Sequence, residues 1–122
     1  MSRALLGRTA QSLGVRAEAA ACAALESDGW AVLARRVRTL AGEIDIVAVR
    51  DGLLAFVEVK ARPSLSDAAF ALTSRQRARL LAAAELVLAA HPDWGSGGIR
   101  FDLILVDAVG RVRRIADAFR LE

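Results

Sequence analysis

The spacing of apolar positions changes along the chain from the period of a helix to the period of a strand. From about Ser12 to Asp28 the chain is rich in alanine and has apolar residues three and four positions apart, which predicts a helix. Gly29 follows as a residue that readily ends a helix. The next segment, Trp30 to Arg38, alternates loosely between apolar and polar residues and predicts a strand.

Two further strands are predicted within GEIDIVAVRDGLLAFVEVKA, the segment that begins at Gly42. Its Asp51-Gly52 pair favours a tight turn, because both residue types tolerate the positive φ that such turns require. If these two residues form the turn, Arg50 pairs with Leu53, and every other cross-strand pair follows from that register.

This register predicts two direct pairs between charged residues, Asp45 with Glu58 and Glu43 with Lys60. Alternation puts these four on one face, together with apolar residues nearer the turn: Val47, Val49, Leu54 and Phe56. The other face is wholly apolar, with Ile44, Ile46, Ala48, Ala55, Val57 and Val59. One face is therefore expected to be core, and the other acidic at its open end.

A second helix is predicted after an irregular segment from Arg62 to Leu72. Thr73 is a suitable N-cap, and Gln76 three residues later completes a capping box. The helix is expected to run to about Ala90 and to end at His91-Pro92, because proline cannot continue it.

Two strands complete the prediction, Ile99 to Asp107 and a short one around Val112 to Ile115. The strand-helix-strand order requires a right-handed crossover, so the third and fourth strands should lie parallel. Arg100 and Asp102 alternate on one face of their strand and are expected to form an ion pair. The fold class is α/β, a sandwich with a central mixed sheet flanked by helices.

Length and composition limit the classes of protein. A chain of 122 residues with 55% hydrophobic and 25% charged residues predicts a single domain over 1–122, globular rather than disordered. It has neither an apolar run long enough to span a membrane nor a secretory h-region. The single cysteine, Cys22, excludes an internal disulfide and is typical of a cytoplasmic protein.

The positive charge of the chain comes from arginine. The net charge is +3, and of 17 basic residues only Lys60 is a lysine. Codon bias, a solvated basic surface and a phosphate-binding surface all explain this composition, and charge alone does not choose among them.

Two opposed carboxylates in a strand pair are costly unless a proton or a cation lies between them. A divalent metal accounts for Asp45 beside Glu58, because two carboxylates with waters are a common Mg²⁺ site. Lys60, two residues beyond Glu58 on the same face, is placed to orient a water or to stabilise a phosphate. The alternative is a solvated face with a Glu43–Lys60 ion pair.

Glu18 is the polar member of a helical stripe that also holds Val15, Cys22 and Leu25. Taken alone it is expected to be exposed. Beside the hairpin acids it becomes a candidate further metal ligand.

The second predicted helix begins TSRQRAR and carries three arginines, Arg75, Arg77 and Arg79, in its N-terminal half. The helix dipole disfavours cations there, so their position favours an approaching phosphate. An exposed cluster that results from arginine bias remains the alternative. Gln76 has a local role in the capping box, and a role in a site is optional for it.

These segments, a helix acid followed by GEID, FVEVK and TSRQ, resemble the PD-(D/E)xK nuclease superfamily, and most of all the YraN-like family of small bacterial proteins. The resemblance extends from GVRAEAAACAALESDGW through GEIDIVAVRDGLLAFVEVKAR to RFDLILVD, nearly the whole chain. It implies a restriction-endonuclease-like α-β-β-β-α-β core. Archaeal Holliday-junction resolvases are similar in the order of their acids. The proline of the PD element is absent, since Ile44 precedes Asp45.

The resemblance also implies roles for individual residues. Asp45 and Glu58 would hold the metal, and Lys60 would be the catalytic lysine. Glu18 matches the helix acid of the resolvase-like branch, and Gln76 matches a glutamine found on the following helix of several nucleases.

We therefore expect a Mg²⁺- or Mn²⁺-dependent endonuclease that acts on DNA, with branched or recombination intermediates as one candidate substrate. Catalytic roles fall to Asp45, Glu58 and Lys60, with Glu18 as a further metal ligand. Binding of nucleic-acid phosphates is assigned to Arg62, Arg75, Gln76, Arg77 and Arg79. A homodimer is expected only by analogy with resolvases. The alternative function is a non-catalytic nucleic-acid- or protein-binding module on the same fold.

Overall fold

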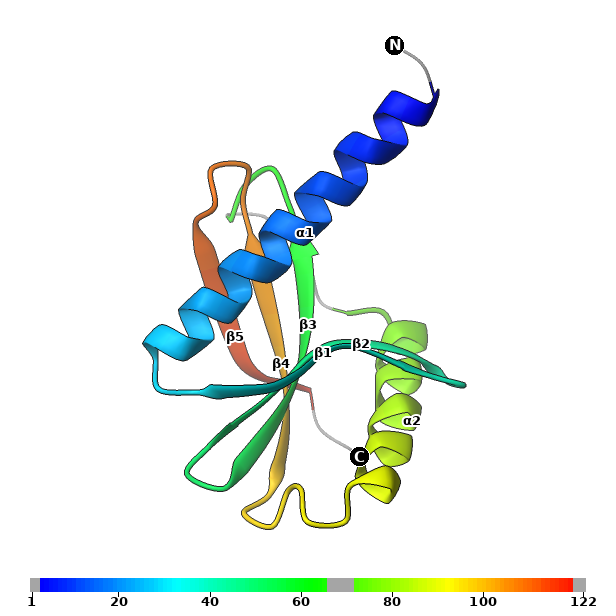
Figure 1. Cartoon of the computed structure of the whole chain (residues 1–122), viewed down its shortest axis with the longest axis vertical. Coiled ribbons are helices and arrows are strands. Elements are labelled where there is room, and N and C mark those ends of the chain that lie inside the picture. Colours follow the sequence, from blue (N-terminus) through cyan, green and yellow to red (C-terminus); the bar gives the residue numbers. More distant parts are fainter. Residues whose placement is uncertain (1–2, 66–71, 120–122) are drawn as a thin grey trace.

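The computed structural model describes residues 3–65 and 72–119, and it describes side chains from residue 14 onward, so most of the predicted irregular segment Arg62–Leu72 lies outside the described residues. The chain forms three layers (Figure 1). One helix, α1 (Arg3–Ser27), covers one face of a sheet, and a second helix, α2 (Ser74–Ala90), covers the other. Within the described residues, no helix is both long and apolar enough to cross a membrane.

The sheet has five strands in the order in which they occur along the chain, as follows: β1 (Ala31–Thr39), β2 (Gly42–Arg50), β3 (Leu53–Ala61), β4 (Ile99–Val106) and β5 (Val112–Phe119). Strands β3 and β4 are parallel, as predicted, and the other neighbours are antiparallel. The central mixed sheet flanked by helices confirms the predicted α/β class and is consistent with a restriction-endonuclease-like core, with β5 added at its edge.

Each face of the sheet carries its own apolar cluster. The α1 side buries Ala21 and Leu25 of the helix against sheet residues Ile46, Ala48, Ala55, Val57 and Ile104. The α2 side buries Leu80 and Ala84 against Val47, Leu54, Phe56, Phe101 and Leu103. The alternation of β2 and β3 places successive side chains in opposite clusters, which accounts for the nearly continuous apolar pattern of these central strands.

Several boundaries differ from the prediction. Helix α1 begins at Arg3 rather than near Ser12, because the preceding residues are good helix formers and a helix tolerates Gly7 and Gly14 at modest cost. Strand β4 ends before Asp107, whose carboxylate accepts hydrogen bonds from the backbone N–H groups of Val109 and Arg111 and so begins a turn.

Strand β5 extends to Phe119 rather than Ile115, and the Phe119 ring stacks on Phe101 with 4.7 Å between centroids. The predicted ion pair is present: two nitrogens of Arg100 donate to the two carboxylate oxygens of Asp102, each at 2.8 Å.

The predicted capping box of α2 is confirmed. The Thr73 hydroxyl accepts from the Gln76 backbone N–H at 3.1 Å, and the Gln76 side-chain oxygen accepts from the Thr73 N–H at 2.8 Å. His91 is the C-cap residue, and its N–H donates to the carbonyls of Val87 and Leu88. The capping box thus holds the first turn of α2 in place.

The predicted register of the β2–β3 hairpin holds only over its half nearest the turn. Pairs run from Arg50–Leu53 to Ile46–Val57 and stop there. Beyond Ile46, β2 continues to pair with β1, through Ile44–Val37 and Glu43–Arg38. The two expected direct pairs, Asp45 with Glu58 and Glu43 with Lys60, are therefore wrong, because β2 and β3 separate at this point, which we call the fork.

At the fork, the Ile44 side chain points to the opposite face of the sheet from the one predicted. Alternation placed it with Ile46 on the all-apolar face, but it lies in the cluster beneath α2. A strand that leaves its neighbour is free to twist, so simple period-two alternation ceases to assign faces beyond the last pair.

Candidate functional site

Asp45 stands at the fork, where its carboxylate takes the place of a backbone partner. Its Oδ2 accepts a hydrogen bond of 2.8 Å from the N–H of Val59, across the gap between β2 and β3. Burial raises the pKa of Asp45 to about 6, and the nearby Glu58 carboxylate adds to the rise. Desolvation of a carboxylate beside another negative charge is a state that a bound cation relieves.

Glu58 and Lys60 lie two positions apart on β3 and so point to the same face. The Lys60 Nζ is 3.0 Å from Glu58 Oε1, and the two side chains are only 24% and 16% exposed. Lys60 thus pairs with its strand neighbour Glu58, whereas the alternative interpretation paired it with Glu43. Glu43 instead lies 3.6 Å from Arg38 of β1, in an exposed pair.

A hollow of about 200 Å³ joins these acids to the first turns of α2. We call it the acidic hollow, and its lining is Glu43, Asp45, Glu58, Gln76, Arg79 and Leu80. Helix α2 reaches this position because its N-terminal half packs over β2. The contact is close at Gly42, where a Cβ would stand 2.9 Å from the Arg79 Cγ, and where φ is +147°. Glycine at 42 thus permits Arg79 to approach the acids.

The other predicted arginines of α2 are outside the acidic hollow. Arg75 and Arg77 are exposed on the same half of the helix, and the Arg77 Nε donates to the Leu72 carbonyl at 3.0 Å. Arg62, just beyond β3, donates from Nη1 to the Ala61 carbonyl. The structure brings Gln76 and Arg79 to the acids and leaves the remaining predicted arginines outside the lining of the acidic hollow.

Glu18 lies on the opposite side of the sheet from α2 and is buried, at 7% exposure. Its carboxylate accepts from the Nε of Arg35 at 3.2 Å and from the Nε of Arg36 at 3.0 Å, both from β1. It is therefore engaged by two arginines, and the expectation that Glu18 taken alone would be exposed is wrong.

Glu18 and Asp45 nevertheless line one space, a hollow of about 490 Å³ that we call the α1 hollow. Its lining comprises Gly14, Val15, Ala17, Glu18, Arg36, Arg38, Glu43, Asp45, Val59 and Ala61. Because Glu43 and Asp45 also line the acidic hollow, the two spaces adjoin at the fork. The helix acid and the hairpin acids are thus brought to one region.

Arg36 lines the α1 hollow, and no sequence signal predicted it there. It stands between the pairs Arg35–Ile46 and Val37–Ile44, level with Asp45 on the neighbouring strand. Its φ is +50°, an uncommon conformation for a residue with a side chain, and such outliers often occur at functional sites. Nothing in the loosely alternating pattern of β1 indicates a residue in this conformation.

The donor set at the fork fits a hard divalent cation in part. Over residues 3–65 and 72–119, no group of three or more His, Cys, Asp or Glu side chains is arranged to hold a metal ion. Mg²⁺, however, is typically held by one or two carboxylates together with waters and substrate phosphates. Asp45 and Glu58 meet that requirement, and burial beside Glu58 raises the pKa of Asp45, a shift that a nearby cation would oppose.

Comparison with known proteins places the chain in a family. The model of a family described as "Uncharacterised protein family UPF0102" matches residues 17–106. A UPF0102 protein of Granulibacter bethesdensis is 61% identical over 120 residues, which cover 98% of this chain and 76% of the relative. A UPF0102 protein of Azorhizobium caulinodans is 50% identical over 115 residues, covering 94% and 88%. The chain belongs to the UPF0102 family.

The predicted YraN-like membership is thereby confirmed at the level of the family. The UPF0102 match begins at Ala17 and ends with β4 at Val106. The matched segment therefore includes every acidic residue that lines the two hollows, and also Lys60, Gln76 and Arg79. Another UPF0102 protein, from Rhodopseudomonas palustris, is 50% identical over 106 residues, 87% of this chain and 82% of the relative.

Proposed function

We propose that this UPF0102 protein is a Mg²⁺- or Mn²⁺-dependent phosphodiesterase that cleaves DNA, with branched or recombination intermediates among its candidate substrates. The observation that carries the proposal is the convergence of Asp45 and Glu58 on one hollow beside Lys60 and the first turns of α2. Asp45 and Glu58 are the residues that would hold the metal. A bound divalent ion supplies charge that polarises the scissile phosphate and lowers the pKa of an attacking water.

Each neighbouring side chain has a distinct task in this proposal. Lys60, held at 3.0 Å from Glu58, orients the water or stabilises charge on the phosphate. Arg79 and Gln76 hold the substrate backbone from the α2 side, where the helix N-terminus also favours an anion. Arg75, Arg77 and Arg62, outside the acidic hollow, bind flanking phosphates without reading sequence.

Glu18 differs from the hairpin acids in its partners and in its proposed role. It lines the α1 hollow together with Asp45, but its carboxylate is bound by Arg35 and Arg36. Its proposed role is to serve as a further ligand only when those arginines move onto a substrate phosphate. Cleavage of a junction would require two sites, so a homodimer is proposed for that substrate.

Cleavage of a defined panel tests the proposal. Duplex, single-stranded, flap and four-way-junction DNA are incubated with the protein and Mn²⁺, Mg²⁺ or EDTA. We expect metal-dependent cleavage that falls on the order of a hundredfold in Asp45→Asn, Glu58→Gln and Lys60→Gln. Glu85→Gln, an exposed residue of α2, is the matched control and should cleave like wild type.

A second measurement separates the metal site from catalysis. Addition of Mg²⁺ or Mn²⁺ should raise the Tm of wild type, and Asp45→Asn and Glu58→Gln should lose that gain. If wild type binds DNA but gains no stability from either metal and cleaves nothing, the alternative function, a non-catalytic binding module, replaces the nuclease. The engagement of Glu18 and Glu58 in ion pairs is the observation that favours this alternative.

A further inference from the structure

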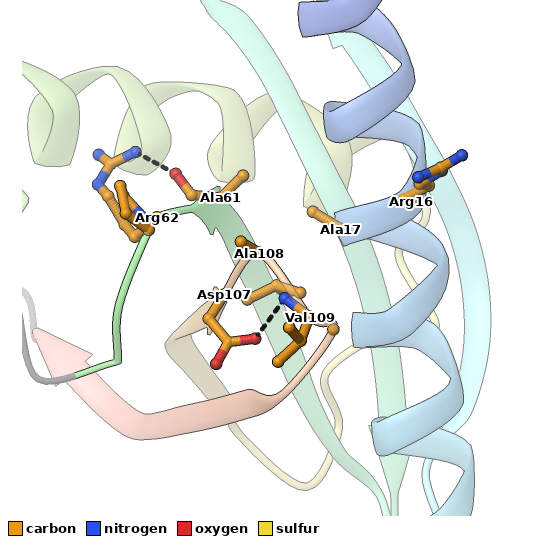
Figure 2. A pocket seen from close by; sticks show the side chains of 10 residues that line it. Arg16, Ala17, Ala61, Arg62, Asp107, Ala108 and Val109 are labelled. Carbon is orange, nitrogen blue, oxygen red and sulfur yellow. Dashed lines mark hydrogen bonds between the residues drawn. The ribbon is translucent and has the colours of Figure 1, made fainter.

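A third cleft continues the line of the two hollows and has a different chemistry. We call it the turn cleft, of about 440 Å³, and its lining is Arg16, Ala17, Ala61, Arg62, Pro63, Val106, Asp107, Ala108, Val109 and Gly110. It lies between α1, the end of β3 and the turn that joins β4 to β5 (Figure 2). Ala17 and Ala61 line both the turn cleft and the α1 hollow, so these two spaces adjoin, as the α1 hollow and the acidic hollow do at Glu43 and Asp45.

The walls of the turn cleft are mainly apolar, unlike those of the acidic hollow. Most of its lining residues are alanine, valine or proline, and one of them, Val109, is 76% exposed. The one carboxylate in the lining is already used, because Asp107 accepts from the backbone N–H groups of Val109 and Arg111 and from the Arg111 Nε. The Asp107 carboxylate is therefore hydrogen-bonded within the turn, and the rest of the lining is an apolar surface with arginines.

Arginines stand at two sides of this apolar surface. Arg16 of α1 lines the cleft and is exposed, and in Figure 2 its guanidinium points away from Asp107 and Val109 toward solvent. Arg62 lies across the cleft beyond the end of β3. A volume of about 440 Å³ is within the range of roughly 300–1,000 Å³ that is usual for small-ligand sites. A nucleotide has a base whose flat faces can pack on apolar walls and a phosphate that arginine can bind, so it matches both parts of this lining.

We propose that the turn cleft receives one unpaired nucleotide of the strand whose neighbouring phosphate lies at Asp45. The inference rests on the proposed function, because the acidic and α1 hollows set where the strand runs. A base inside a duplex is stacked and paired and cannot enter a cleft without being extruded. The substrate class is therefore nucleic acid with unpaired nucleotides, such as a single strand, an overhang or a branch point.

Binding without metal tests the inference apart from cleavage. Fluorescence anisotropy in EDTA compares a labelled single strand, a duplex with an overhang, and a blunt duplex of the same sequence. We expect wild type to bind the first two on the order of tenfold more tightly than the blunt duplex, because one base is buried against the apolar walls of the cleft. Equal affinity for all three would overturn the proposal.

A matched pair of variants locates the preference. Ala108→Leu fills the turn cleft from an exposed turn residue, and Ala19→Leu adds the same bulk on the exposed side of α1. Filling the cleft should abolish the preference for unpaired DNA and leave duplex binding unchanged, while the control keeps both. Arg16→Gln should also weaken single-strand binding. Retention of the full preference in Ala108→Leu would contradict the inference.

The outcomes for the two proposals are distinguishable. If Asp45→Asn keeps the preference, Ala108→Leu removes it, and no substrate is cleaved, then the cleft inference holds and the nuclease proposal fails. If cleavage is metal-dependent but blunt duplex is bound and cut as well as the overhang, the nuclease proposal holds and the cleft inference fails.

Discussion

Asp45 bonds to the Val59 N–H at 2.8 Å across the point where two paired strands separate. The Asp45 side chain of β2 thus satisfies a backbone N–H of β3 that a β2 carbonyl would satisfy in a regular ladder. This relationship keeps the fork open and holds a carboxylate in a partly buried place beside Glu58. The same feature that interrupts the sheet therefore creates the candidate site.

The first prediction concerns the pH dependence of stability in the metal-free protein. Burial, with Glu58 nearby, raises the pKa of Asp45 from 3.8 to about 6. Above pH 6 the folded chain holds a carboxylate that would be better solvated after unfolding, so Asp45 lowers the free energy of unfolding there. As the pH falls through 6, the folded state takes up the proton first and stability rises, until below about pH 4 both states are protonated.

The expected size of that change is roughly 2–3 kcal/mol, from about 1.4 kcal/mol for each unit of pKa. Thermal denaturation in EDTA from about pH 4.5 to about pH 8 measures it. Asp45→Asn should be more stable than wild type at the upper end and lose this advantage at the lower end. Asp93→Asn, at an exposed position, is the control. If the difference in stability between wild type and Asp45→Asn stays constant with pH, the raised pKa of Asp45 is contradicted.

A second prediction concerns the ion pair between Glu18 and Arg36. The carboxylate is buried and the Nε–Oε2 distance is 3.0 Å, so the pair is shielded more than a surface pair. A double-mutant cycle with Glu18→Gln and Arg36→Gln should give a coupling energy of about 1 kcal/mol. The exposed pair Arg38–Glu43, at 3.6 Å, serves as the comparison and should give almost none. Equal coupling in the two cycles would contradict the placement of Glu18.

Opposite effects are predicted for two glycine substitutions. Gly42→Ala should destabilise the protein by about 1 kcal/mol or more, since φ is +147° and the new Cβ meets Arg79 at 2.9 Å. Gly14→Ala should stabilise it by about 0.5–1 kcal/mol, because the residue lies within α1 and a Cβ there has no atom within 4 Å. Urea denaturation measures both. A stabilising Gly42→Ala would show that Arg79 does not depend on this close approach.

Removal of the Arg100–Asp102 ion pair of β4 should cost more stability than the substitutions above. The Asp102 side chain is fully buried, accepts both hydrogen bonds from Arg100, and also accepts the Asp117 N–H at 2.9 Å. Asp102→Asn leaves the Arg100 charge without its partner and should cost about 3 kcal/mol. The loss should appear in urea denaturation with little effect on metal binding, because Asp102 lies outside the lining of the acidic and α1 hollows. A loss below about 1 kcal/mol would contradict this structural role.

Local sequence signals predicted most of the secondary structure and the fold class. The Asp51-Gly52 turn set the register of the hairpin next to it, and the Thr73–Gln76 capping box located the start of α2. These features depend on neighbouring residues only, so the sequence contains them directly. Short intervals from the turn also placed Asp45 and Glu58 at the same end of the hairpin, although the direct pair predicted between them does not form.

Tertiary structure decided how those residues meet. The separation of β2 from β3 after Ile46–Val57 depends on β1, α1 and α2 together, so the turn could not predict it. The arginines that hold Glu18 come from β1, 17 and 18 positions further along the chain. The turn cleft is formed by three segments that are far apart in the sequence, and no motif in any of them predicts a cleft. Sequence supplied the chemical groups and their local order, while long-range packing decided which of them share one space.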